Sequence, residues 1–506
     1  MGLRRHPRWD LVTRRRRPGI GEEATSGRRD HRSTDGRETR CHVLSHHIPS
    51  AMPLVSVNPT TEQEIERHPL HTGREVEHRL DRAASAFEVN RSRSFDERAA
   101  RLERAADLLE DNAPALGALM TEEMGKPLTQ AQAEAEKCAW VCRYYAEHGA
   151  DFLADRAVET AARKSYVAHE PLGPILAIMP WNFPFWQAFR FGAPTLMAGN
   201  VVLLKHAPNV TGCAEAIADL LREAGFADHE LQVLRVDEET VGTVLDDQRV
   251  RGATLTGSVP AGAAVARQAA AQIKPTVLEL GGSDPFIVCA DADLEKAASV
   301  GCTARMQNNG QSCIAAKRFI VERAVLDDFQ ERLVENVEAL TVGPPTDRET
   351  DVGPMARADL RDTVHDQVER AIGAGAVAVA GGHTLERDGF FYAPTVLADV
   401  DPGTVAFDEE IFGPVASVIA ADDAEHAVAL ANDTRFGLGG SIFTEDLEKG
   451  ERMARSLEVG CVFVNEMTKS DPRVPFGGIK DSGYGRELSH HGIRAFVNAK
   501  TVWVEE

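Results

Sequence analysis

The sequence predicts an α/β protein built on a doubly wound parallel sheet, and three observations lead to this fold class. From about residue 165, short apolar runs alternate with helical segments, the pattern of parallel strands joined by crossover helices. Motifs containing Gly or Pro follow several of these runs, where ligands of such sheets bind. The chain has 506 residues, with 43% hydrophobic and 26% charged residues, enough for two or three domains with large cores.

The first α/β unit has five strand candidates: Ile175–Met179, Val201–Lys205, Leu231–Val236, Ala253–Thr256 and Val277–Leu280. The helical segments between them cover about 185–198, 211–224, 239–246 and 259–272. A second unit continues after residue 282 to about 470, with strand candidates Phe286–Cys289, Arg318–Val321, Val377–Ala380, Val415–Ile419 and Val462–Val464. Both units repeat the same alternation of strand and helix, which is why we expect two parallel sheets.

Before the first unit, Asp96–Met124 carries apolar residues spaced for one buried helical face. A second helix is predicted from about Thr129 to Phe152, and Asn58–Thr61 is typical of a turn between short strands. At the other end, Ala495–Val504 is an extended segment that could pair with another chain.

Residues 1–51 lack apolar periodicity and are predicted to be disordered. They contain twelve Arg and six acidic residues, a charge of +6. The arginines at 14–17 allow a nucleic-acid arm or a targeting segment, but no apolar stretch follows them, so a secretory signal is not expected. Our preferred interpretation is a start site assigned too early, with Met52 as the natural start.

The net charge of the whole chain is −22, so the rest of the chain carries −28. Only eleven of the 56 basic residues of the whole chain are Lys. Such an acidic surface repels nucleic acid and anionic membranes. It also stays soluble in concentrated salt, which favours a halophilic source. A genome rich in G and C, which favours Arg and Ala, is the alternative explanation.

The eight cysteines form no CxxC pair, and no apolar run approaches 18 residues. We therefore expect neither a disulfide framework, nor a metal site, nor a transmembrane helix, and a cytoplasmic location.

Cys313 follows a Gly-containing turn, Asn309–Ser312, and precedes a strand candidate. A lone cysteine is usually a small buried hydrophobe. A turn of this kind can nevertheless present a thiol at the mouth of a cleft, with backbone N–H groups around it.

Asn182 lies between two prolines in Pro180–Pro184, so its side-chain amide points in a defined direction. An Asn N–H and the backbone N–H of a nucleophile together make an oxyanion hole, although Asn near a helix start is often only a cap. Glu279 ends a mostly apolar strand, where burial would raise its pKa and make it a candidate general base. A partnered structural carboxylate is the alternative.

Three further motifs suit a dinucleotide. Lys205 stands at a strand end, where it can donate to a ribose or a phosphate, or simply be exposed. Gly257 and Ser258 form a strand–Gly–helix junction whose free N–H groups can hold phosphate. Glu410 and Phe412 lie two residues apart in a loop, suited to a sugar hydroxyl and a planar ring.

Taken together, PWNFP at 180–184, ELGG at 279–282, GQSC at 310–313 and EEIFGPV at 409–415 resemble the NAD(P)-dependent aldehyde dehydrogenase superfamily from about residue 53 to 506. The resemblance implies an NAD(P)-dependent non-acylating enzyme in which Cys313 is the nucleophile, Glu279 the base and Asn182 the oxyanion donor. It implies that Lys205, Gly257, Ser258, Glu410, Phe412 and Trp181 bind the cofactor, and that Glu487 is a secondary carboxylate of the proton relay.

The resemblance also implies a domain order. A Rossmann-like cofactor domain would take 52–155 and 174–281, and an α/β catalytic domain would take 282–472. Residues 156–173 and 473–506 would form a β oligomerisation arm and C-terminal segment, giving a homodimer or homotetramer.

Substrate and cofactor choice stay open at this stage. FPFWQAFR at 183–190 and GRELSHHGI at 485–493 resemble the succinate-semialdehyde dehydrogenase branch, in which Arg190 would bind the substrate carboxylate. Gln307 stands where many members carry another arginine, so a broad-specificity aldehyde dehydrogenase is the main alternative. Pro208 replaces the Glu of many NAD-selective members, which leaves both NAD and NADP as candidates. A non-catalytic homologue is a remote alternative, because Cys313 and Glu279 are both present.

Overall fold

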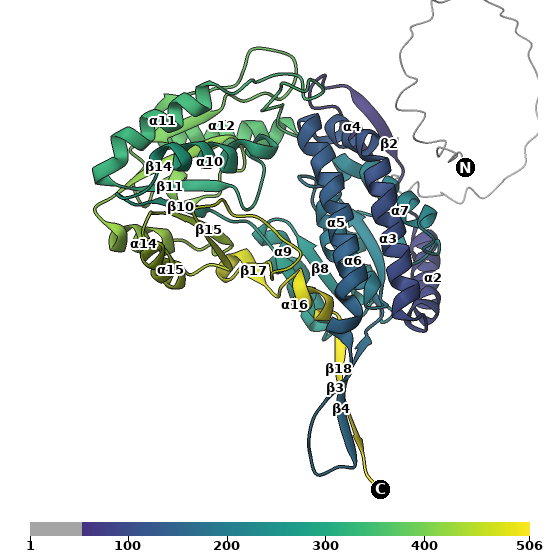
Figure 1. Ribbon diagram of the computed structural model, residues 1–506. Coiled ribbons are helices and arrows are strands. Elements are labelled where there is room, and N and C mark those ends of the chain that lie inside the picture. The colour runs from purple at the N-terminus through teal and green to yellow at the C-terminus, as the bar shows by residue number, and fades with distance from the viewer. Residues whose placement is uncertain (1–52) are drawn as a thin grey trace, which may run out of the picture. The chain divides into compact units, whose positions relative to one another are not determined.

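Two mainly parallel sheets form the core of the computed structural model, which describes residues 53–506 (Figure 1). Leu54–Glu506 make one compact unit. The predicted α/β class, with a Rossmann-like sheet and a second α/β sheet, is confirmed. The predictions for residues 1–51 lie outside the described residues, and the predicted domain boundaries stay predictions.

The first sheet has six strands in the order β17-β9-β8-β5-β6-β7, all parallel except the β17–β9 pair. Its strands are β5 (Pro174–Met179), β6 (Val201–His206), β7 (Leu231–Val233), β8 (Gly252–Thr256), β9 (Thr276–Glu279) and β17 (Gly483–Tyr484). β17 comes from the C-terminal segment, which sequence analysis had not joined to this sheet. The predicted strand at 231–236 ends at Val233.

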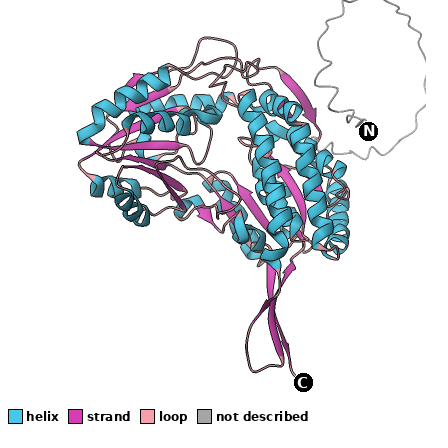
Figure 2. Cartoon of the chain, in the orientation of Figure 1, coloured by secondary structure: helices cyan, strands magenta, loops and turns pink. Residues whose placement is uncertain are grey.

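Helices cover both faces of this sheet (Figure 2). One face is packed by α2 (Gly73–Arg91), α8 (Glu238–Asp246) and α9 (Val259–Ala271). The other is packed by α6 (Trp186–Met197) and α7 (Thr211–Glu223), with α3 (Phe95–Asp111), α4 (Ala113–Met124) and α5 (Leu128–Leu153) behind them. Sequence analysis missed α2, which begins at the capping box of Thr72 and Glu75.

The strand order reverses between β5 and β8. From β5 the chain moves outward to β6 and β7, then returns to place β8 on the other side of β5. Asn182 follows β5 and Gly257 follows β8, so both predicted motifs lie at this switch point. Open α/β sheets bind their ligands there, beyond the carboxyl ends of the strands.

The second sheet has seven strands in the order β12-β13-β14-β11-β10-β15-β16, of which only β12 is antiparallel to its neighbour. Its strands are β10 (Asp284–Val288), β11 (Ala316–Glu322), β12 (Val377–Ala380), β13 (Thr395–Ala398), β14 (Val415–Ala421), β15 (Gly439–Phe443) and β16 (Cys461–Val464). Cys313 and Glu410 both lie just before strands of this sheet. Motifs therefore lie at the amino ends of strands in the second sheet and at the carboxyl ends of strands in the first. Both sets contribute to the same candidate site.

Helices also cover both faces of the second sheet. One core contains residues of α12 (Ala358–Gly373), α13 (Val405–Asp408), α14 (Ala424–Asn432) and α15 (Leu447–Ser456). The opposite core contains residues of α10 (Leu294–Met306) and α11 (Leu326–Glu338). Short 3₁₀ turns are η1 (Pro208–Val210), η2 (Gln307–Gly310), η3 (Arg323–Val325) and η4 (Lys480–Ser482).

A three-stranded sheet projects beyond the helices in Figure 1. It contains β3 (Arg156–Ala157), β4 (Lys164–Pro171) and β18 (Val497–Val504), which follows α16 (Ser489–Arg494). β18 pairs along its whole length with β4 of its own chain. The remaining hairpin, β1 (Leu54–Val57) with β2 (Glu64–His68), encloses the predicted turn at 58–61.

The single helical stretch predicted over 96–124 is wrong, because it divides into α3 and α4 at Asn112. Asn112 has φ −104° and ψ 7°, outside the helical range, and its side chain donates to the carbonyl of Leu108 at 2.8 Å. Pro114 follows in the first turn of α4, where its missing N–H costs nothing. The apolar spacing continues across the break, so periodicity alone did not reveal it.

Candidate active site

A left-handed turn precedes Cys313. Asn308, Asn309 and Gly310 have φ values of 56°, 57° and 71°, a conformation that L-residues rarely adopt. A Cβ at Gly310 would collide with the backbone of Gly413, so only glycine fits there. Such strain persists only where the surroundings hold it in place.

The side chains of the two asparagines supply that support. Asn309 Nδ2 donates to the carbonyls of Gly125 and Pro354 at 2.9 and 2.8 Å, and its Oδ1 accepts from Gly353 N at 2.7 Å. Asn308 Nδ2 donates to the carbonyl of Asn182 at 2.9 Å. The turn before Cys313 is therefore fixed to three separate segments.

Arg305 holds the same turn from the other side. Its buried guanidinium donates to the carbonyl of Gly310 at 3.0 Å and to those of Ile411 and Gly413 in the loop before β14. Burial lowers the pKa of Arg305 to about 9. One side chain thus connects the Cys313 turn to the loop of Glu410 and Phe412, and sequence analysis gave no sign of it.

Asn182 is buried, and its Nδ2 donates to the carbonyl of Gln311 at 3.1 Å. An amide nitrogen has two N–H groups, so a second donor is left for an atom bound near Cys313. Glu134 of α5 holds the following segment by accepting from the backbone N–H groups of Phe185 and Trp186, each at 2.9 Å. The structure brings Asn182 to the Cys313 turn, as predicted.

The Cys313 thiol is half-buried at this turn. Burial raises its pKa to about 12, and the positive charges of Arg190 and Lys317 oppose the rise. A thiol with such a pKa is protonated at neutral pH, so attack on a carbonyl needs a base to take its proton.

Glu279 ends β9 with both carboxyl oxygens buried and, within residues 53–506, without a hydrogen-bond partner. Burial raises the pKa of Glu279 well above its ordinary value, and the neighbouring Glu487 adds to the rise. The charges of Arg190 and Arg486 act in the opposite direction. An unpartnered carboxyl with a raised pKa is the kind of group that general base catalysis uses.

Arg190 forms a buried ion pair with Glu487. Its Nη2 also donates to Thr256 Oγ1 at 3.4 Å, and the guanidinium lies 4.7 Å from the centre of the Phe476 ring. The predicted contact of Arg190 with a substrate carboxylate stays a prediction. In the structure this cation already has a carboxylate partner and acts electrostatically on both Cys313 and Glu279.

On the first sheet, Lys205 is the half-buried penultimate residue of β6. Burial lowers the pKa of Lys205, while Asp237 and Glu238 of the next turn oppose this. Ser258 caps α9, and a Cβ at Gly257 would meet only Leu255, at 3.5 Å. The Gly257 turn thus has room for a diphosphate to approach the start of α9.

On the second sheet, Glu410 accepts from Gly282 N at 3.1 Å and pairs with Lys317 at 3.3 Å. Phe412 packs edge-on against Trp181, with ring centres 5.8 Å apart. The two predicted aromatic residues therefore come together from different sheets. These positions fit a dinucleotide that runs from β6 and β8 toward Cys313.

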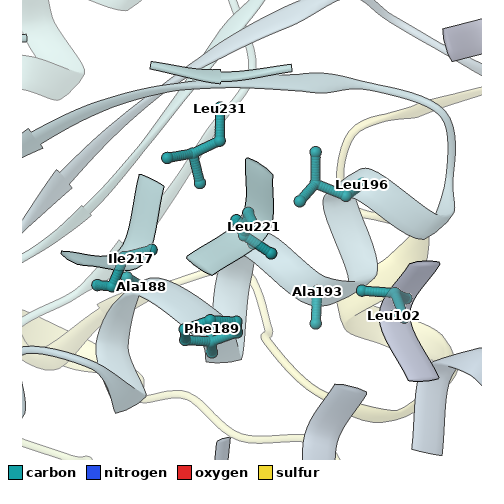
Figure 3. Close-up of a pocket in the computed structure, with 9 residues that line it drawn as sticks. Leu102, Ala188, Phe189, Ala193, Leu196, Ile217, Leu221 and Leu231 are labelled. Carbon is teal, nitrogen blue, oxygen red and sulfur yellow. The ribbon is translucent and has the colours of Figure 1, made fainter. Parts of the chain in front are cut away.

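An apolar pocket elsewhere in the unit has no part in this arrangement. It lies between α3, α6, α7 and β7, and Figure 3 shows its lining as aliphatic and aromatic side chains. No polar or titratable side chain lines it, so it is a packing void. Among residues 53–506 no three His, Cys, Asp or Glu side chains are grouped to hold a metal ion. No helix of that part of the chain is long and apolar enough to cross a membrane.

Comparisons with known proteins identify the family of the chain. The model of the aldehyde dehydrogenase family matches residues 48–502. A Mycobacterium tuberculosis protein named succinate-semialdehyde dehydrogenase (NADP⁺) 1 is 52% identical over 456 residues, covering 90% of this chain and 100% of that protein. A Mycobacterium avium protein named succinate-semialdehyde dehydrogenase (NADP⁺) is 49% identical over 457 residues, covering 90% and 97%.

Among solved structures, succinic semialdehyde dehydrogenase from Streptococcus pyogenes in complex with NADP⁺ superposes with a TM-score of 0.88. It is 36% identical, and the match covers 90% of this chain and 100% of that chain. The fold, the motifs and these matches agree. The chain belongs to the aldehyde dehydrogenase family and is an oxidoreductase that oxidises aldehydes with NAD(P).

Proposed function

We propose that this enzyme oxidises succinate semialdehyde to succinate with NADP⁺. Relatives at 52% and 49% identity carry that name, and the S. pyogenes structure contains NADP⁺. Two observations support the catalytic part: the hydrogen bond from Asn182 to the Cys313 turn, and the buried Glu279, whose carboxyl has no hydrogen-bond partner within residues 53–506. Together they supply an oxyanion donor, a nucleophile and a base.

The first half of the reaction forms a thioester. A base removes the proton of Cys313, and the thiolate sulfur bonds to the aldehyde carbon. The resulting oxyanion accepts hydrogen bonds from Asn182 Nδ2 and from the Cys313 backbone N–H. A bound nicotinamide would supply the acceptor for the hydride that leaves this carbon.

The second half hydrolyses the thioester. Glu279 takes a proton from water as the water oxygen bonds to the acyl carbon, and Cys313 leaves as the thiolate. Arg190 and Glu487 position and tune Glu279 through the buried ion pair beside it. Because a transfer to coenzyme A would not need this base, Glu279 favours hydrolysis.

We propose that the cofactor binds between the two sheets. Lys205 and Glu410 would bind the riboses, Gly257 and Ser258 would hold the diphosphate, and Trp181 and Phe412 would contact the cofactor. Pro208 adds no carboxylate at the third position after Lys205, which supports NADP⁺. Asp237 and Glu238 lie within electrostatic range of Lys205, so the preference has to be measured.

A broad-specificity aldehyde dehydrogenase is the second candidate. Two observations favour it: Gln307 replaces an arginine of the branch, and Arg190 is occupied by Glu487. A kinetic panel separates the two, with succinate semialdehyde, butanal and benzaldehyde tested against NAD⁺ and NADP⁺ at low and high salt. Equal kcat/KM for all three aldehydes would refute the succinate semialdehyde proposal.

Two variants test the chemistry itself. Cys313→Ala abolishes formation of reduced cofactor, whereas the control Cys302→Ala, at a cysteine of α10, retains it. Glu279→Gln gives a burst of one reduced cofactor per site followed by slow turnover. The reason is that the thioester still forms, whereas its hydrolysis is slowed. A steady-state rate unchanged in Glu279→Gln would refute the role of Glu279 as base.

We propose a homodimer or homotetramer assembled through the β3-β4-β18 arm, in a protein of the cytoplasm adapted to high salt. Trp503 and Val504 of β18 are 50% and 41% exposed, an apolar edge that a second copy could cover. Light scattering of a chain with Trp503→Lys and Val504→Lys tests the assembly. A mass equal to that of the unchanged enzyme would refute the role of this edge.

A further inference from the structure

Lys317 is a buried cation that contacts both the nucleophile segment and the loop of Glu410. It is the second residue of β11, and its side chain is 3% exposed. Its Nζ donates to the carbonyls of Ser312 and Cys313 at 2.9 and 2.8 Å, and it lies 3.3 Å from Glu410 Oε1. A lysine ammonium has three N–H groups, so these three contacts occupy all of them.

Two glycines bring Glu410 close to the same carbonyl. The N–H of Gly282 donates to Glu410 Oε1 at 3.1 Å. A Cβ at Gly282 would lie 2.8 Å from the carbonyl oxygen of Cys313, and one at Gly281 would collide with the Glu410 carboxylate. Glycine permits approaches this close because it has no Cβ. The Glu410 carboxylate, the Lys317 ammonium and the Cys313 carbonyl therefore form one contiguous group.

The turn before Cys313 already has other supports. Arg305, Asn308 and Asn309 fix its backbone to separate segments. Of the residues that the structure describes, only Lys317 both pairs with Glu410 and donates to the Cys313 carbonyl. Lys317 thus joins the loop of Glu410 to the nucleophile, which the other supports do not do.

The charges in this group act on the thiol with opposite signs. Burial raises the pKa of Cys313, the ammonium of Lys317 lowers it, and the carboxylate of Glu410 raises it again. Burial lowers the pKa of Lys317 itself, and Glu410 opposes this. The other titratable groups that face the thiol are Arg190 of α6, Asp284 of β10 and Cys461 of β16. The thiolate is therefore favoured most when Glu410 neutralises Lys317 least.

We propose that Lys317 is a positioning residue that couples the occupancy of Glu410 by the cofactor to the reactivity of Cys313. The proposal rests on the proposed function, in which Glu410 binds a ribose. A hydroxyl that donates to this carboxylate reduces the field that opposes the ammonium. Lys317 would then favour the thiolate more strongly, so that the nucleophile would be readied when the cofactor is in place.

The first measurement needs no cofactor. Iodoacetamide alkylates the thiolate of Cys313, and mass spectrometry of the Cys313 peptide gives the rate between pH 7 and 10. Lys317→Met lowers the rate roughly tenfold at a given pH, because a nearby cation that favours the thiolate is lost. Glu410→Gln raises the rate, because the charge that opposes Lys317 is lost. Lys317→Arg keeps the positive charge and stays closer to the unchanged enzyme.

The second measurement repeats the alkylation with saturating NADPH, whose reduced ring carries no positive charge. The ratio of the rates with and without NADPH is taken for each protein, so that shielding of the thiol by the bound cofactor cancels between proteins. This ratio is about fivefold or more higher in the unchanged enzyme than in Lys317→Met or Glu410→Gln, the range of a typical coupling between sites. Fluorescence titration of NADPH gives its Kd and shows that each protein is saturated.

Lys296→Met is the matched control, because this lysine of α10 is exposed. It leaves the alkylation rate and the effect of NADPH unchanged. If Lys317→Met does not fold, Glu410→Gln and Lys317→Arg still decide the matter. A Glu410→Gln protein that is alkylated no faster than the unchanged enzyme would then overturn the coupling.

The outcomes separate this coupling from the proposed function. If Glu410→Gln binds NADPH as tightly as the unchanged enzyme, the proposed cofactor site is wrong and the coupling falls with it. If Glu410→Gln weakens NADPH binding while Lys317→Met keeps both the rate and the effect of NADPH, the coupling is wrong and the proposed function stands. Faster alkylation in Lys317→Met would mean that the lysine only closes the turn over the thiol, and would also overturn the coupling.

Discussion

Asn182 and Gln311 are joined by a hydrogen bond from the Asn182 amide to the Gln311 carbonyl, 3.1 Å long. This bond connects the end of β5 in the first sheet to the turn that opens β11 in the second. The oxyanion donor and the nucleophile are therefore held in a fixed relation before any substrate enters, as electrostatic preorganisation requires.

Asn182→Ala lowers kcat about 10²- to 10³-fold, because one donor to the oxyanion is lost. Asn336→Ala, at an exposed position of α11, serves as the control and retains full activity. Single-turnover measurements of reduced cofactor give the rate. A loss of kcat/KM that comes from a raised KM, with kcat unchanged, would contradict the role of Asn182 in the transition state.

Glu487→Gln moves the acid limb of the kcat/KM profile to lower pH. Glu487 raises the pKa of Glu279 and Arg190 lowers it, so removing the negative charge lowers the pKa of the base. A base with a lower pKa is deprotonated at lower pH, and activity persists further into acid.

Arg190→Gln moves the acid limb of the kcat/KM profile in the opposite direction. Loss of the guanidinium raises the pKa of Glu279 and that of Cys313, so the acid limb moves to higher pH. Profiles of both variants, measured in one buffer series, check the pair. Shifts in the same direction would show that the ion pair does not tune Glu279.

Arg305→Met lowers the free energy of unfolding by about 3 kcal/mol or more, because several buried carbonyls lose their donor at once. Arg332→Met breaks an exposed ion pair with Glu295 on α11 and costs less than about 1 kcal/mol. Urea unfolding followed by circular dichroism compares the two. Equal costs would mean that Arg305 does not fix the Cys313 turn.

Ile273→Gly raises the free energy of unfolding by up to about 1 kcal/mol. Ile273 has φ +54° and is 93% exposed. Its left-handed conformation therefore costs free energy that burial of the side chain does not offset. Glycine adopts this conformation without that strain. Ile273→Ala keeps a Cβ and gains less, and thermal unfolding of the two variants distinguishes strain from hydrophobicity.

Sequence analysis predicted most strands of both sheets, since buried parallel strands appear as apolar runs between helical segments. It also identified Cys313, Glu279 and Asn182 as candidates, because each lies in a distinct motif beside a strand. The position of each of these residues depends on the strand next to it, and the apolar pattern of the sequence predicts those strands. Their catalytic roles stay predictions until the variants are measured.

Pattern could not reveal partners that are distant in sequence. Arg190 and Glu487 are 297 residues apart, and Lys137 and Ser470 are 333 apart. Arg305 was missed because an arginine in a helix is normally a surface residue. Nothing near it in the sequence shows that it donates to the carbonyls of Gly310, Ile411, Gly413 and Val415. The break at Asn112 was missed because apolar spacing continues through it.

The pairing of β17 with β9 has a consequence for how the enzyme is made. Thr276 and Tyr484, which join these strands, are 208 residues apart in the chain. On the ribosome, Glu279 emerges long before Glu487 exists. Until the C-terminal segment is made, β9 lacks its β17 partner and Glu279 lacks the neighbouring carboxylate that raises its pKa. The surroundings of Glu279 are therefore completed only when the C-terminal segment has folded back onto β9.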